Sequence, residues 1–169
     1  MNTGALYRLS GAAAIAGGVA RIVASFSWIH DPITLEWLYD AIDVLLLFGV
    51  IGIYLERAPR LGFSGLAAFI VAVAALSFIG GPDADPFGFS TYEQGSAALA
   101  LAMVALSIVW LRAKERPLSP ALLWFGSVIA VGVFSMLPEP LPSYGLVAAG
   151  VLFGAAFVTA GTALLTRNP

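Results

Sequence analysis

Long apolar segments recur along this chain, and they constrain its fold more than any other feature. One of them, V-L-L-L-F-G-V-I-G-I-Y-L from residue 44 to residue 55, contains no charged side chain. A helix needs roughly 20 apolar residues to cross the hydrocarbon core of a bilayer. Windows of about that length predict six transmembrane helices, at residues 6–29, 33–56, 62–80, 92–113, 119–137 and 143–166.

The composition supports the same assignment. Hydrophobic residues make up 60% of the 169 residues and charged residues 11%, whereas a soluble domain has about 25% charged residues. We therefore expect the lipid bilayer to be the main partner of this surface. A net charge of −2 without a basic cluster gives no reason to expect nucleic acid. The chain has no cysteine, which excludes disulfides and thiolate chemistry.

Each break between the apolar windows contains proline, which ends helices. The breaks are short, so consecutive helices are expected to run antiparallel. The first window continues to Trp28, which favours a retained span over a cleaved signal peptide. The predicted fold class is all-α: a single polytopic domain over residues 1–169, with six transmembrane helices in three tandem antiparallel hairpins.

The basic residues predict how this domain is oriented. If the breaks alternate between the two sides of the membrane, seven of the eight basic residues fall on one side. The positive-inside rule places that side, with both termini, in the cytoplasm of a bacterial inner membrane. Trp and Tyr residues lie near the window ends, as expected for interfacial belts. The seven basic residues are Arg8, Arg57, Arg60, Arg112, Lys114, Arg116 and Arg167.

The spacing of several motifs predicts an internal repeat. Acid-proline pairs begin at Asp31, Asp85 and Glu139, and basic residues close alternate windows at Arg57 and Arg112. These regular steps favour three copies of one hairpin, at residues 6–60, 61–116 and 117–169. Any regular six-span protein shows part of this pattern, so the repeat is a hypothesis.

Three charged residues are predicted to lie inside the membrane. Arg21 is the one basic residue away from the cytoplasmic flank, and charged residues at such depth usually face a bundle interior and find a partner. Reflecting Arg21 across the first outer break places it level with Asp40. Asp43 has no obvious cation of its own and is the best candidate for carrying a proton. The alternative is that Arg21, Asp40 and Asp43 form a purely structural network.

Two further acids, Glu36 and Glu93, follow the outer breaks and could line an outer vestibule. They could equally be carboxylates that stabilise helix N-termini. The single histidine, His30, is expected to be solvated rather than a metal ligand. One histidine also excludes haem with two axial histidines. No metal, cofactor or catalytic motif is predicted.

Two stretches of the sequence resemble segments of other bacterial membrane proteins. The opening Y-R-L-S-G-A-A-A-I-A-G-G and the stretch L-L-L-F-G-V-I-G-I-Y-L-E-R-A-P-R-L-G-F-S-G-L-A-A-F are similar to uncharacterised bacterial six-span membrane proteins of unknown function. A looser likeness, in size and hairpin number, is to three-hairpin acid-stress membrane proteins of enteric bacteria. The resemblance implies no catalytic residues.

Three functions remain open from the sequence. The first is a structural, stress-response or accessory membrane protein, with a membrane-protein partner or a second copy of itself. The second is a small transporter or a proton or ion pathway that uses the intramembrane carboxylates. The third is a membrane enzyme, which the lack of a nucleophile-base or metal-ligand set disfavours. We therefore expect no enzymatic activity.

Overall fold

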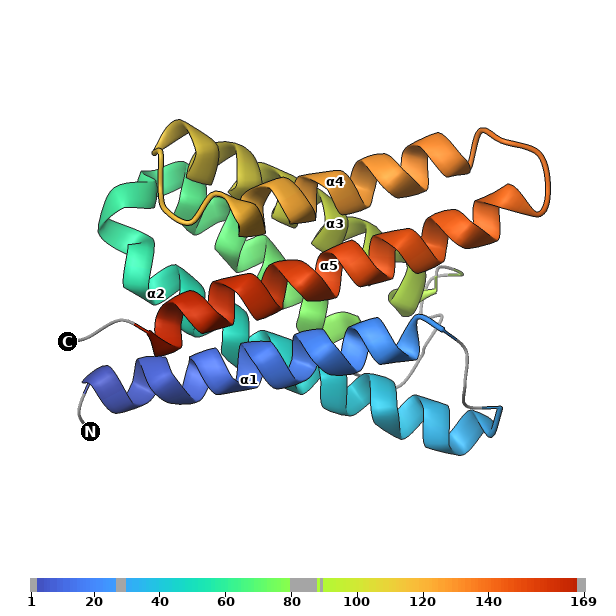
Figure 1. The fold of residues 1–169 in the computed structure, drawn as a ribbon, viewed down its shortest axis with the longest axis horizontal. Coiled ribbons are helices and arrows are strands. Elements are labelled where there is room, and N and C mark those ends of the chain that lie inside the picture. The colour runs from blue at the N-terminus through green and yellow to red at the C-terminus, as the bar shows by residue number, and fades with distance from the viewer. Residues whose placement is uncertain (1–2, 27–29, 80–87, 89, 167–169) are drawn as a thin grey trace.

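The computed structural model describes residues 3–26, 30–79, 88 and 90–166, and all of its regular structure is helical. The five helices are α1 (Thr3–Ala24), α2 (Pro32–Ile79), α3 (Thr91–Arg112), α4 (Ser119–Phe134) and α5 (Leu141–Leu165). Each helix packs against the next along the chain, and α5 packs against α1, so the helices form a closed ring. Figure 1 shows this bundle with both termini at the same end.

The windows at 33–56 and 62–80 both fall in α2, in which two helical segments run together across a kink, so the structure has five helices where six separate ones were predicted. The predicted break E-R-A-P-R is helical, and Pro59 lies within the helix. The chain instead bends at Gly62, whose φ of 59° and ψ of −161° suit glycine alone. Figure 1 shows the second part of α2 running back along the first.

Four helices, α1, α2, α3 and α5, are long and apolar enough to cross a membrane. The fifth, α4, has 16 residues and is about 24 Å long, somewhat less than the roughly 30 Å of a bilayer core. Large apolar side chains are exposed on the outside of the bundle, including Phe63 at 83% and Trp37 at 71%. An exterior of this kind is typical of a surface that contacts lipid or another protein. The chain is therefore a helical protein with four helices whose length and hydrophobicity suit a membrane span.

Local sequence explains where the helices begin. Asp31 precedes Pro32, the first residue of α2, and its carboxylate accepts a 2.9 Å hydrogen bond from the Thr34 backbone. This is an N-cap followed by proline at the first helical position. The hydrogen bonds from Thr34, first from its side chain and then from its backbone, lower the pKa of the Asp31 carboxyl. Ser90 caps α3 in the same way, through the Glu93 N–H.

Apart from Glu56 and Glu115, the basic and acidic residues near the two ends separate along the bundle as predicted. We call the end with the termini, the bend of α2 and the α3–α4 connection the basic end (Figure 1). The opposite end, with the connections that precede α2 and α5, is the acidic end. Among described residues, the basic end carries Arg8, Arg57, Arg60, Arg112, Lys114 and Arg116, and the acidic end carries Asp31, Glu36, Glu93 and Glu139.

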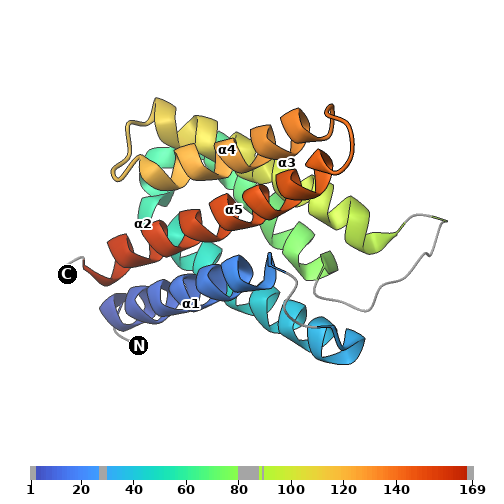
Figure 2. The same ribbon diagram turned by 45° about the vertical axis from the view of Figure 1, so that its right-hand side comes forward.

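Glycine brings α1 very close to α5. A Cβ on Gly18 would lie 2.5 Å from the Gly154 carbonyl oxygen, and one on Gly11 would lie 2.9 Å from that of Gly161. The two pairs lie seven residues apart on both helices, as antiparallel packing requires. Figures 1 and 2 show α1 and α5 side by side. Gly150 and Gly154 both face the α1 segment, so small residues of α5 permit this close packing.

Three of the aromatic residues expected at lipid interfaces are buried in the bundle instead. Trp110 and Trp124 are fully buried and meet edge to face, with ring centroids 6.0 Å apart. Tyr54, 7% exposed, stacks on Phe69 at 4.1 Å. Position near a window end cannot show which way a side chain points. Trp37, Tyr92 and Tyr144 are exposed, and Trp28 lies outside the described residues.

Candidate functional site

The predicted intramembrane residues come together where α1, α2 and α5 meet. The Arg21 guanidinium lies over the Tyr39 ring, 5.5 Å from its centroid. Arg21 Nε is 3.9 Å from the position that a Cβ on Gly150 would take. The missing side chain of Gly150 leaves room for Ser25, while Arg21 would only make an ordinary van der Waals contact with that Cβ. Arg21, Asp40 and Asp43 are all half-buried.

The register of α1 against α2 places Arg21 between Asp40 and Asp43. A Cβ on Gly49 would contact Ala14, and a Cβ on Gly17 would contact Leu45 and Leu46. Continuing this antiparallel register places Arg21 level with residues 41–42. The pairing of Arg21 with Asp40 stays a prediction.

The interaction within this cluster is electrostatic rather than a close ion pair. Arg21 and Asp40 are both near enough to act on the charge of Asp43. Within the part of the chain that the structure describes, no ion pair shorter than 4.0 Å joins Arg21 to either carboxylate. We call Arg21, Tyr39, Asp40 and Asp43 the outer cluster. It sits nearer the acidic end and is accessible from the surface.

The proposed vestibule acids lie on different helices. Glu36 is exposed near the start of α2, and Glu93 is exposed in the first turn of α3. The Glu93 backbone N–H donates to Ser90 Oγ at 3.3 Å, so Ser90 and Glu93 have the spacing of a capping box. This geometry favours the helix-terminus interpretation of Glu93. A shared vestibule stays a prediction. Exposed His30 is not part of any metal-ligand group among the described residues.

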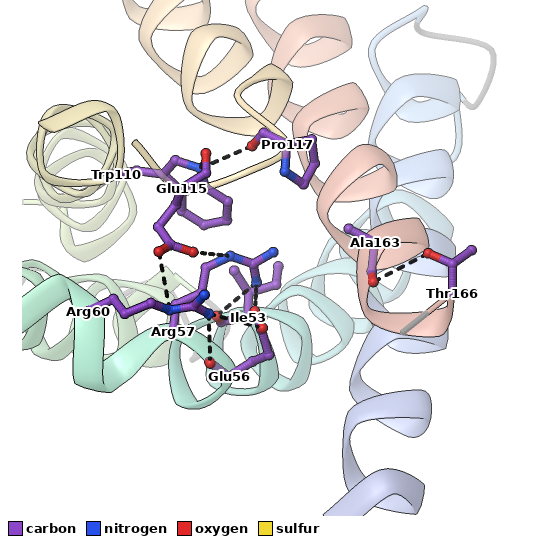
Figure 3. Close-up of polar contacts among 9 residues, drawn as sticks. All are labelled: Ile53, Glu56, Arg57, Arg60, Trp110, Glu115, Pro117, Ala163 and Thr166. Atoms are coloured by element: carbon purple, nitrogen blue, oxygen red, sulfur yellow. Dashed lines mark hydrogen bonds and ion pairs between the residues drawn. The ribbon is translucent and has the colours of Figure 1, made fainter. Parts of the chain in front are cut away.

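A second charged cluster lies at the basic end, and sequence reasoning missed it. The Glu115 carboxylate accepts from Arg60 Nε at 3.1 Å and lies 3.9 Å from Arg57 Nε. Glu56 pairs with Arg57, and also with Arg60 at 3.3 Å. Figure 3 shows the Glu115 carboxylate between the two guanidinium groups. We call Glu56, Arg57, Arg60 and Glu115 the inner ion cluster.

The inner ion cluster is buried against tryptophan. Arg57 is 3% exposed, and its guanidinium lies 4.3 Å from the centroid of the Trp110 ring, a cation–π contact. The Trp110 indole N–H points to the carbonyl oxygens of Glu115 and Pro117, each at 3.0 Å. Figure 3 shows these contacts fastening the α3–α4 connection onto α2. The two acids neutralise Arg57 and Arg60.

One signal in the sequence could have revealed this cluster. Glu56 and Glu115 are the only two acids in the breaks assigned to the basic side. An acid placed among basic residues on each of two breaks is a pattern typical of ion pairing. Comparisons with protein-family models, curated proteins and solved structures found no match for the chain. The resemblance to uncharacterised six-span proteins therefore stays a hypothesis.

Proposed function

We propose that the chain is a multi-pass protein of the bacterial inner membrane, with six crossings and both termini in the cytoplasm. In this topology the bend of α2 at Gly62 is an inner turn between two crossings. A straight α2 of 48 residues would be about 72 Å long, more than twice the bilayer core. The helix must therefore turn back or leave the membrane.

We further propose a structural or accessory role, in which the protein partners another membrane component and neither conducts ions nor catalyses a reaction. The observation that carries this proposal is the apolar layer between the outer cluster and the inner ion cluster. Asp43 and Glu56 are separated along α2 by about 20 Å. Between them, Leu46, Val50 and Ile53 are at most 1% exposed.

The other helices close the same layer. Ala14 on α1 and Phe157 and Ala160 on α5 are fully buried. Buried Ser107 and Ser127 donate hydrogen bonds to carbonyl oxygens of their own helices, at 2.7 Å each, and so offer no relay. A proton path needs connected polar groups, and the buried side chains of this layer among the described residues are mainly apolar and form no such chain. The transport alternative is therefore the weaker of the two.

Proton flux tests this proposal. The purified protein is reconstituted in liposomes that contain a pH-sensitive dye, and a pH gradient is imposed. We expect the rate of collapse to equal that of empty vesicles, with a protonophore as positive control. Flux in the wild type that disappears in Asp43→Asn would overturn the proposal in favour of a proton pathway.

A further inference from the structure

The surface of the basic end is more positive than the residues of this end add up to, because its acids are buried. The two acids at this end, Glu56 and Glu115, have side chains only 3% and 8% exposed and are occupied by Arg57 and Arg60. The charged side chains that remain exposed among the described residues of this end are all cationic. They are Arg8, Arg60, Arg112, Lys114 and Arg116.

Four of these cations gather where the bend of α2 meets the α3–α4 connection. Arg60 is 45% exposed at its side chain and is held by Glu115, whose neighbours in the chain are Lys114 and Arg116. Arg112 is the last residue of α3. Because Glu115 faces inward, its two basic neighbours stay on the surface. Arg112, Lys114 and Arg116, which lie beside the paired Arg60, form what we call the basic rim.

The backbone under the basic rim is fixed before any ligand binds. The Trp110 indole N–H holds the carbonyl groups of Glu115 and Pro117, and the Glu115 N–H donates to the Trp110 carbonyl at 3.2 Å. Lys114 has a φ of 53°, an uncommon value for a residue with a side chain. A rim whose cations need little ordering loses less entropy on binding.

We propose that the basic rim binds the headgroups of anionic phospholipids. The charges complement a phosphodiester, and several guanidinium groups together favour lipids that carry net negative charge. Phe63, exposed next to the bend of α2, adds an apolar group that reaches the acyl chains beside the same headgroups. If the basic end faces the cytoplasm, as proposed above, these lipids belong to the cytoplasmic leaflet.

Thermal unfolding in mixed micelles tests the proposal without reference to topology. Unfolding is followed by the fluorescence of buried Trp110 and Trp124, in neutral detergent with phosphatidylglycerol or with phosphatidylcholine. We expect phosphatidylglycerol to raise the Tm more, since a ligand that binds the folded state stabilises it. Added salt should reduce the difference. Equal Tm values with the two lipids would overturn the proposal.

Charge variants test the location of the site. We expect Lys114→Gln to weaken phosphatidylglycerol binding about fivefold, and the triple variant with Arg112→Gln and Arg116→Gln about 100-fold. The matched control is Arg8→Gln, which removes one exposed cation of the same end outside the basic rim. If Arg8→Gln and Lys114→Gln weakened phosphatidylglycerol binding equally, binding would depend on the overall charge of this end, and the proposal of a site at the basic rim would be overturned.

Two further measurements separate the remaining outcomes. The charge-conserving variant Arg112→Lys with Arg116→Lys should keep most of the preference for phosphatidylglycerol over phosphatidylcholine. Its binding then shows that the triple variant loses affinity through lost charge rather than through substitution at these positions. Inorganic phosphate at the same concentration should give no rise in Tm. A rise equal to that from phosphatidylglycerol would show a free-anion site and overturn the assignment to lipid.

Discussion

Glu115 lies at the centre of the inner ion cluster, although it stands in a break that reads as a basic surface loop. Its carboxylate compensates two guanidinium groups, one of them almost fully buried. Removing one partner of a buried ion pair leaves an uncompensated charge, which is more destabilising than the loss of a surface pair. The stability of the basic end therefore depends on this one side chain.

We expect Glu115→Gln to lower the free energy of unfolding by about 3–5 kcal/mol, because Glu56 is then left as the one carboxylate that compensates Arg57 and Arg60 in the inner ion cluster. Thermal unfolding in detergent, monitored by tryptophan fluorescence, measures the effect. Arg116→Gln is the matched control, since Arg116 is exposed and has no ion pair among the described residues. Equal Tm values for the two variants would contradict a stabilising role for the cluster.

Arg21 and Asp43 offer a second test at the scale of single residues. We expect Arg21→Leu and Asp43→Leu each to destabilise the protein, and the double variant to be more stable than the sum of the single effects implies. A coupling free energy of about 0.5–3 kcal/mol is typical of interacting residues. Additive effects in this double-mutant cycle would show that the outer cluster does not hold α1 against α2.

At the scale of elements, glycine decides how closely α1 approaches α5. We expect Gly18→Ala to destabilise the bundle by about 1–3 kcal/mol, because its Cβ would meet the rigid Gly154 backbone. The control is Gly132→Ala in α4, where a Cβ would meet nothing within 4 Å. That control should be neutral or stabilising by up to about 1 kcal/mol. Thermal unfolding of both variants checks the contrast.

The bend of α2 is a second element whose geometry depends on one glycine. We expect Gly62→Ala to destabilise the protein by about 1–3 kcal/mol, since its backbone angles are strained for any residue with a Cβ. Space is not the cause, because nothing lies within 4 Å of the added atom. Urea or thermal unfolding measures the loss. Wild-type stability in Gly62→Ala would mean that the bend is not fixed there.

At the scale of the whole molecule, the six-crossing proposal predicts which ends of the bundle face each side of the membrane. The chain has no cysteine, so each introduced cysteine is unique. We expect a membrane-impermeant maleimide to label Glu139→Cys in intact cells. Ser64→Cys, beside the bend of α2, and Lys114→Cys should be labelled only after permeabilisation. Labelling of Ser64→Cys in intact cells would exclude an inner turn at this bend.

Much of this architecture could be predicted, because it depends on amino-acid composition and on the spacing of apolar segments along the sequence. Apolar windows located α3, α4 and α5 to within about three residues, overran the end of α1, and divided α2 in two. Proline and acid-proline pairs marked most helix ends. The separation of basic from acidic residues along the bundle was also predictable. The position of the bend was not, since α2 continues through Pro59 and turns at Gly62, which only the backbone shows.

The sequence alone determined that this chain is helical, apolar on its exterior and basic at one end, because these properties are sums over many residues. The tertiary structure alone decided which charges meet. It turned Glu115 toward Arg57 and Arg60, placed Arg21 over the Tyr39 ring, and buried Trp110 and Trp124. These outcomes depend on the rotation and register of helices against one another. A shift of one residue turns a side chain about 100° around its helix, so apolar periodicity cannot specify such pairs.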